Sequence, residues 1–226
     1  MQRRVFITGG TGYVGRALLP ELLGRGHDIR ALVRLGSERK LPPGVISTLG
    51  DPLVASTFAG AVSSSDTFIH LVGTSHPNPF KKAEFRRVDF ASAKASIDAA
   101  VGAGISHFIY VSVAHPAPVM KSYISVRMEC EEMVRSSGLN ATILRPWYVL
   151  GPGHRWPYAL LPLYWMWERI QATREGARRL GLVTLNQMVA ALICAVENPS
   201  TPQGGHAYFR VFTVPDIRRL GTGVPD

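Results

Sequence analysis

The chain has 226 residues, of which 46% are hydrophobic and 18% charged, and this balance excludes a disordered chain or a coiled coil. Its 25 basic and 16 acidic residues give a formal net charge of +9. The basic excess is spread along the chain rather than gathered into a stripe, so we expect no nucleic-acid partner. Two cysteines without a metal-binding or disulfide spacing predict no metal site and a reducing, cytoplasmic location.

The longest apolar stretch, Trp156 to Trp167, contains two prolines and is shorter than the roughly 20 residues that a spanning helix needs. We therefore expect no membrane span.

Short β-branched runs alternate with helical patterns over residues 1–150, which is typical of βαβ units. The expected strands are Arg3–Thr8, Asp28–Val33, Val45–Leu49, Thr67–Val72, His107–Ser112 and Ala141–Leu144. The expected helices are Tyr13–Arg25, Leu53–Ala59, Lys81–Val101 and Ser122–Ser136. This alternation predicts an α/β fold with a doubly wound parallel sheet of the Rossmann type.

After Pro146 the pattern changes, because Gly151, Pro152 and Gly153 interrupt the chain. A helix is expected over Leu185–Glu197, with Thr184 and Gln187 as its capping box. A short strand, Ala207–Phe212, and a last helical turn near Ile217 follow. Residues 151–226 therefore form a small C-terminal extension of the same domain, expected on the substrate side.

The segment Thr8 to Gly15 reads TGGTGYVG and joins the first strand to the first helix. Glycine spacing of this kind is typical of a dinucleotide site, because the turn is tight and the backbone must approach a pyrophosphate at the helix start. An ordinary glycine-rich turn is the alternative. The expected cofactor-binding residues of this loop are Gly9, Gly10, Thr11, Gly12, Tyr13, Val14 and Gly15.

The end of the second strand indicates which dinucleotide is preferred. An NAD site usually carries Asp or Glu there, to bind the ribose 2′-hydroxyl. This chain has Arg34 at that place, with Arg39 and Lys40 close behind. A guanidinium can bind a 2′-phosphate in a bidentate manner, so the sequence favours NADP, with NAD possible. A solvated arginine after a strand is the alternative interpretation.

Several motifs together resemble the short-chain dehydrogenase/reductase superfamily, in its extended and atypical branches of epimerase/dehydratase-like and NmrA-like proteins. They are the TGGTGYVG loop, the Asp51–Pro52 pair, HLVG, YVS and LRPWYVLGPG. The resemblance implies that residues 1–150 form the NAD(P)-binding domain and that Asp51 contacts the adenine. It also implies that Leu71, Val72 and Gly73 line the adenosine ribose and phosphates, and that Pro146 to Val149 flank the nicotinamide.

In that superfamily a Tyr-x-x-x-Lys pair and a helper hydroxyl carry the catalysis. By resemblance, Tyr123 is the proton donor or acceptor, Arg127 takes the place of the lysine, and Ser112 is the helper. Arginine keeps the positive charge that favours a tyrosinate, but its planar group does not reproduce the contacts of an ammonium. The alternative is that Tyr123 packs on the sheet and Arg127 lies at the surface. Asp89 stands where many relatives carry asparagine.

Other polar residues give weaker signals. His70 is expected at the end of the fourth strand and His76 in a proline-rich loop, with no zinc spacing between them. Glu129, Glu131 and Glu132 are expected on a solvated helix face, with Glu131 pairing with Arg135. The aromatic stretch Trp147–Trp167 is interpreted as a pocket, an association surface or a cap on the small C-terminal core.

The sequence thus predicts an NADP(H)-binding oxidoreductase that acts on a small, apolar carbonyl or alcohol, as a monomer or homodimer. One rival is a binding protein without turnover, resembling the nitrogen-metabolite regulators or a complex I accessory subunit. Another is a nucleotide-sugar epimerase or dehydratase, which needs a larger substrate region than about 75 residues usually supply.

Overall fold

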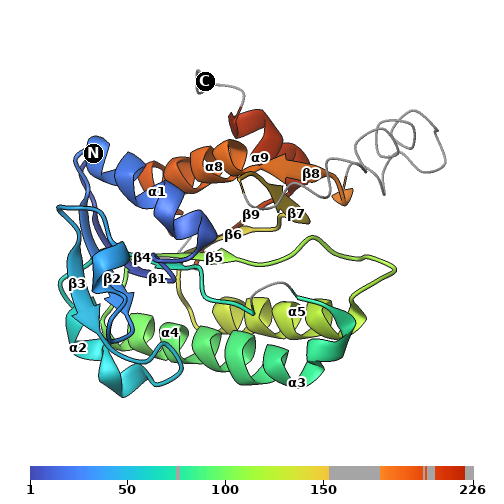
Figure 1. The fold of residues 1–226 in the computed structure, drawn as a ribbon, viewed down its shortest axis with the longest axis horizontal. Helices are drawn as coiled ribbons and strands as arrows, with labels where there is room; N and C mark the ends of the chain where they lie inside the picture. Colours follow the sequence, from blue (N-terminus) through green and yellow to red (C-terminus); the bar gives the residue numbers. More distant parts are fainter. Residues whose placement is uncertain (75–76, 153–178, 201, 203–206, 222–226) are drawn as a thin grey trace.

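The computed structural model describes residues 1–74, 77–152, 179–200, 202 and 207–221 (Figure 1). Seven parallel strands form the main sheet in the order β3-β2-β1-β4-β5-β6-β9. They are β1 Arg4–Thr8, β2 Asp28–Val33, β3 Ile46–Leu49, β4 Thr67–His70, β5 His107–Val111, β6 Ala141–Leu144 and β9 Phe209–Phe212. The Rossmann-type doubly wound sheet that the sequence predicts is confirmed.

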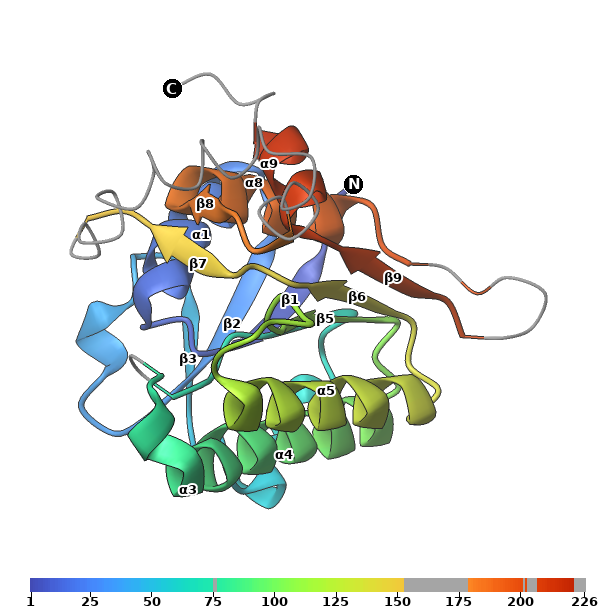
Figure 2. The same cartoon turned by 90° about the vertical axis from the view of Figure 1, so that its right-hand side faces the viewer.

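Helices cover both faces of this sheet (Figures 1 and 2). The α-helices are α1 Tyr13–Gly24, α2 Ala59–Val62, α3 Lys82–Glu84, α4 Ala91–Gly102, α5 Lys121–Ser136, α8 Leu185–Glu197 and α9 Val214–Gly221. Short 3-10 turns lie at Glu38–Lys40 (η1), Ala55–Thr57 (η2) and Pro79–Lys81 (η3), and a π-helical segment, η4, lies at Phe85–Phe90. In both views α1, α8 and α9 lie on one face, and α2, α4 and α5 lie on the other.

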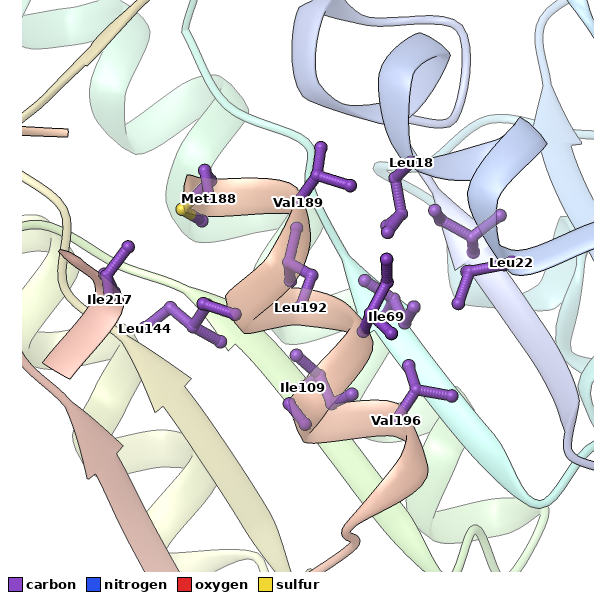
Figure 3. Close-up of a cluster of buried hydrophobic side chains, with 14 of the residues drawn as sticks. Leu18, Leu22, Ile69, Ile109, Leu144, Met188, Val189, Leu192, Val196 and Ile217 are labelled. Carbon is purple, nitrogen blue, oxygen red and sulfur yellow. The ribbon is translucent and has the colours of Figure 1, made fainter. Parts of the chain in front are cut away.

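A core of buried apolar side chains fills each side of the sheet. On the side of α1 and α8, aliphatic residues from both helices pack on the central strands (Figure 3). Those labelled there are Leu18, Leu22, Ile69, Ile109, Leu144, Met188, Val189, Leu192, Val196 and Ile217. On the other side, Phe6, Phe68 and Phe108 follow one another across β1, β4 and β5, with ring centroids 5.2 Å apart in each pair. Burying one such side chain contributes about 1.5–3 kcal/mol.

The local patterns place most elements correctly. Strands β2 and β6 and helix α8 begin and end where the sequence predicts. The capping box of α8 is present, since the Thr184 hydroxyl accepts from the Gln187 backbone and the Gln187 side chain accepts from the Thr184 backbone. The C-terminal residues return to the main sheet through β9, which pairs with β6. A domain boundary near residue 150 stays a prediction.

Three expectations differ from the structure. The single helix expected over Lys81–Val101 is divided by the π-helical turns of η4, which turn Asp89 into the interior. The helix expected over Leu53–Ala59 is replaced by a 3-10 turn and the short α2. A parallel pair of strands, β7 (Tyr148–Leu150) and β8 (Leu182–Thr184), was not expected, because only their pairing across a long separation defines them.

Most of the aromatic stretch, including Trp156 and Trp167, lies outside the described residues. Trp147 is described, and it is half-buried against the core on the α1 and α8 side. Among the described residues, no helix has the length and apolar character that crossing a membrane requires.

Two buried histidines make the fold sensitive to acid. Burial lowers the pKa of His70 and of His107 from 6.5 to about 3, so both stay neutral in the folded chain at pH values where the unfolded chain protonates them. The free energy of unfolding should therefore fall as the pH drops below about 6.5, by up to about 1.4 kcal/mol per pH unit for each histidine. Urea unfolding at a series of pH values measures this slope.

The variant His70→Asn provides the control, because it removes one of the two groups. The slope of its unfolding free energy between about pH 5.5 and about pH 4 should be smaller than that of the parent by about 1.4 kcal/mol per pH unit. Equal slopes in the two proteins would contradict the assignment of His70 as a neutral buried group.

Candidate cofactor cleft and catalytic site

The glycine loop between β1 and α1 packs closely on its neighbours. Gly9 has a φ of +79°, and a Cβ there would lie 2.8 Å from the Leu71 carbonyl carbon. A Cβ at Gly15 would lie 2.5 Å from the Gly10 carbonyl oxygen and 2.6 Å from that of Gly9. Both positions therefore require glycine, one because of its backbone conformation and both because another backbone is too near. Gly12 is the N-cap residue of α1 and borders the open side of the loop.

A cleft of about 450 Å³ opens beside this loop, where the carboxyl ends of β1 to β4 meet. The strand order reverses between β1 and β4, and such switch points are where ligands bind in open α/β sheets. Eight of the expected cofactor residues line the cleft: Gly9, Thr11, Gly12, Arg34, Asp51, Leu71, Val72 and Gly73. The others do not line it: Gly10, Tyr13, Val14, Gly15, Pro146 and Val149. A volume of this size lies within the range of about 300–1,000 Å³ that small-molecule and cofactor sites have.

The residues outside the cleft lie in two places. Gly10 is buried in the glycine loop, while Tyr13, Val14 and the buried Gly15 belong to the first turn of α1. Pro146 follows β6 and accepts a hydrogen bond from the Ala114 backbone at 2.9 Å, while Val149 lies in β7.

Sequence reasoning missed the wall of the cleft that η4 supplies, including Arg87. Adjacent residues of a helix point in different directions, and this separates the two neighbouring arginines of η4. Arg86 pairs with Glu129 at 2.7 Å, whereas Arg87 lines the cleft. Arg34 and Arg87 are exposed, and neither has an ion-pair partner in the described part of the chain. The cleft lining also includes the carboxylates of Asp51 and Glu84, so the two unpaired guanidinium groups give anion-binding donors without a net positive lining. An ordinary helical period offered no signal for Arg87.

Beside the cleft, Arg127 is buried, which contradicts the interpretation that places it at the surface. Its Nη2 lies 2.7 Å from Asp89 Oδ1, and Asp89 is fully buried. Its Nε donates to the Tyr123 hydroxyl, and its Nη1 donates to the Tyr110 hydroxyl and the Val111 carbonyl, each at 3.1 Å. The guanidinium N–H groups thus donate to atoms inside the protein. A buried charge is stable only when it is paired and hydrogen-bonded.

Asp89 connects this ion pair to the cleft wall. Its carboxylate accepts hydrogen bonds from the Thr74 backbone at 3.2 and 3.3 Å and from the Thr74 hydroxyl at 2.5 Å. Thr74 and the preceding Gly73 both line the cleft. A Cβ at Gly73 would collide with Arg127 Nη2, so the glycine leaves room for the guanidinium behind the cleft wall.

Tyr123 lies in the first turns of α5, half-buried, with its ring 5.0 Å from that of Phe85. Burial raises the pKa of its phenol above the ordinary value; Arg127 opposes this rise and Asp89 adds to it. Burial therefore raises the pKa of Tyr123 by more than Arg127 lowers it. At neutral pH Tyr123 is a phenol rather than a tyrosinate.

The helper hydroxyl, Ser112, follows β5 and is buried. Its backbone N–H donates to Leu144, but its Oγ has no hydrogen-bond partner among the described residues. Val113 and Ala114 are also buried. The structure thus joins Tyr123 and Arg127 by a hydrogen bond, while the Ser112 hydroxyl has no hydrogen bond to either in the described part of the chain.

The interpretation of Glu131 as a solvated residue paired with Arg135 is wrong. Glu131 is buried, and Arg145, at the end of β6, donates to its carboxylate, with one hydrogen bond of 3.0 Å. Arg135 instead pairs with Glu132 at 3.4 Å. A helical repeat cannot reveal a partner on a neighbouring strand, and the bidentate pair is the stronger one. His70 lies at the end of β4 as expected, whereas His76 falls outside the described residues.

This fold and cleft define a dinucleotide-binding Rossmann protein of the short-chain dehydrogenase/reductase type. A family model described as NAD(P)H-binding matches residues 9–155, so the chain belongs to the NAD(P)H-binding family of that superfamily. It is 32% identical over 154 residues to a ceramide reductase of Caulobacter vibrioides, covering 66% of this chain and 47% of that protein. It is 26% identical over 170 residues to a 4-hydroxy-2-methyl-3-oxo-4-farnesyl-3,4-dihydroquinoline-1-oxide ketoreductase of Stigmatella aurantiaca, covering 66% and 51%.

The chain therefore spans about half the length of these two relatives. Among solved structures it resembles the Bordetella bronchiseptica enzyme WbmH in complex with NAD⁺, with a TM-score of 0.68. That similarity covers 93% of this chain and 75% of WbmH at 20% identity, and it establishes the shared fold.

The close packing of the glycine loop leads to a test of its role. Gly15→Ala should lower stability and abolish nicotinamide-cofactor binding, because the new methyl group would overlap two backbone carbonyls and push the loop outward. Gly24→Ala is the matched control in the same helix, since nothing lies within 4 Å of its Cβ position. It should leave binding intact and stabilise the helix by about 0.5–1 kcal/mol. Calorimetric titration and thermal unfolding of both variants measure these effects, and equal binding by the two would contradict the assignment.

Proposed function

We propose that this protein is an NADP(H)-dependent reductase that acts on the carbonyl group of an apolar molecule. The cleft is the single observation that carries the proposal. It joins a glycine loop, a strand-end arginine and the buried ends of β1 and β4 at the switch point of the sheet. The glycine loop fits a dinucleotide site, because a side chain at Gly9 or Gly15 would overlap the backbone that shapes the cleft.

The phosphate groups would lie over the N-terminus of α1, where backbone N–H groups and the helix dipole favour an anion. Arg34 and Arg87 would bind the 2′-phosphate or the adenine from the two sides of the cleft mouth. Asp51 is less suited to contact a phosphate, because it is anionic and its Oδ1 already accepts from the Leu53 backbone at 2.9 Å. These positions support NADP over NAD.

The proposed chemistry needs one proton donor from this chain. When bound, a reduced nicotinamide supplies the hydride. Tyr123 would donate its hydroxyl proton to the substrate oxygen, and the phenolate would then recover a proton from water. Arg127 Nε, 3.1 Å from the phenol oxygen, would hold the ring in place through its hydrogen bond.

The names of the two relatives support an apolar substrate, since they specify a ceramide and a farnesyl-bearing ring. Trp147, partly buried against the core on the α1 and α8 side, follows Pro146, which the resemblance places beside the nicotinamide. A small apolar ketone is the simplest probe of this class.

A cofactor-binding protein without turnover is the second candidate. The observation that favours it is the Ser112 hydroxyl, which is buried and has no hydrogen bond to Tyr123 in the described part of the chain. Such a protein would bind NADP(H) in the same cleft and would reduce no carbonyl compound.

Cofactor choice is tested by Arg34→Asp. This change replaces a phosphate-binding charge by a ribose-binding carboxylate, so affinity for NADPH should fall about ten- to a hundredfold, while affinity for NADH is kept or improved. Arg39→Asp is the control, because it makes the same charge change in η1, outside the cleft lining. Isothermal titration of the parent and both variants with NADPH and NADH measures the affinities, and an equal loss for NADPH and NADH in Arg34→Asp would show that Arg34 does not discriminate.

Turnover is tested by Tyr123→Phe. If Tyr123 donates the proton, reduction should slow by about 10²–10⁴-fold while cofactor affinity stays nearly unchanged. Tyr208→Phe is the control, because it removes a hydroxyl at the amino end of the sheet, where the Tyr208 carbonyl bonds to Ala141. A screen of apolar ketones with NADPH gives the rates. No turnover by the parent, despite NADPH binding, would favour the second candidate.

A further inference from the structure

Asp89 and Arg127 depart from the superfamily pattern at two places in the sequence, yet in the structure they are one interaction. Each is buried, and the guanidinium and the carboxylate are 2.7 Å apart. An asparagine and a lysine at these positions would together carry one positive charge. Aspartate and arginine together carry none. The exchange therefore removes the net charge beside the tyrosine.

We infer that Asp89 is a positioning residue that keeps Tyr123 a proton donor: by pairing with Arg127 it cancels the charge that would otherwise stabilise a tyrosinate. A site with this arrangement is suited to giving a proton to a substrate oxygen, and is poorly suited to removing one. The inference rests on the proposed function only where it concerns proton transfer to a substrate. The pairing of Asp89 with Arg127 and its effect on Tyr123 can be measured without any substrate.

The hydrogen bonds agree with this role. A guanidinium can only donate, so Nε of Arg127 occupies a lone pair of the phenol oxygen and leaves the hydroxyl proton unused. No described residue accepts that proton. Since Asp89 holds Nη2, the Nε edge of the group is turned toward Tyr123. Asp89 thus fixes the direction of the guanidinium as well as its charge.

The other titratable groups around this pair come from β4, β5 and α5. Tyr110 accepts from Arg127 Nη1, and burial raises its pKa well above 10, so it stays neutral. Burial raises the pKa of the Cys130 thiol to about 11, and burial lowers that of His70 to about 3. All three are uncharged at neutral pH. Asp89 is therefore the group whose charge opposes that of Arg127.

The first measurement is the titration of Tyr123 in the cofactor-free chain. The ultraviolet difference between each protein and its Tyr123→Phe counterpart isolates the signal of this tyrosinate. In Asp89→Asn the guanidinium charge is no longer cancelled, so the pKa of Tyr123 should fall by about one to three pH units. In Arg127→Gln the carboxylate is left alone, so that pKa should rise. A titration that Asp89→Asn leaves unchanged or moves upward would overturn the inference.

The second measurement is a double-mutant cycle on unfolding. Asp89→Asn and Arg127→Gln each leave an unpaired buried charge, so each should raise the unfolding equilibrium constant about a hundredfold or more. The combined variant buries no charge, and its loss should be far smaller than the product of the two single effects. If the effects of the two single variants on the unfolding equilibrium constant simply multiply in the combined variant, the pairing is overturned. If Asp89→Asn alone does not fold, the combined variant and Arg127→Gln still form a comparison, in which the former must have the lower Tyr123 pKa.

The pH profile of reduction adds a readout that a merely structural role would not move. With NADPH and an apolar ketone, the parent should keep its reduction rate up to high pH. In Asp89→Asn the rate should begin to fall at a lower pH than in the parent, because its Tyr123 ionises at a lower pH. Both titration and unfolding use the chain without cofactor or substrate. A failure to find any substrate would therefore count against the proposed function and leave the result for Asp89 intact.

Discussion

The ion pair between Arg127 and Asp89 holds together the three segments that form the site, because neither charge can be buried without the other. Arg127 lies in α5 and bonds to the end of β5 through the Val111 carbonyl. Asp89 lies in η4 and holds Thr74 after β4. An isolated buried charge costs several kcal/mol, so these elements keep their relative positions for as long as the pair is intact. The same pair places Tyr123 and supports the wall of the cofactor cleft.

The topology of the sheet explains why the cleft and this pair are neighbours. In a parallel sheet all strands end at the same edge, and here the chain leaves β1 toward one face and β4 toward the other. The loop at Gly9 and the segment at Leu71 therefore approach each other, to the point where a side chain at Gly9 would meet the Leu71 backbone. The glycine loop and the buried Asp89–Arg127 pair are thereby brought close to one short segment, Leu71 to Thr74.

Much of the fold and half of the cleft follow from local sequence. Buried runs such as Val5 to Ile7 predict strands, and the glycine spacing after β1 predicts the close turn, because both depend on residues near in the chain. The π-helical turns of η4 could not be predicted in this way. They break the helical period, so the sequence does not reveal that Arg87 lines the cleft or that Asp89 is buried. The position of Glu131 fails for a different reason, because its partner Arg145 follows a neighbouring strand, which a helical repeat cannot reveal.

The sequence by itself determined the class of protein: the alternation of strands and helices, the glycine loop and the arginine after β2 are local features, and local backbone geometry and spacing decide them. Only the tertiary structure decided the charge at the candidate catalytic site. Whether Arg127 acts as a cation toward Tyr123 depends on which groups share its water-free surroundings, and Asp89 reaches it from a different element. Coulomb interactions are strong where water is excluded, and burial arises from packing between elements rather than from the order of residues along the chain.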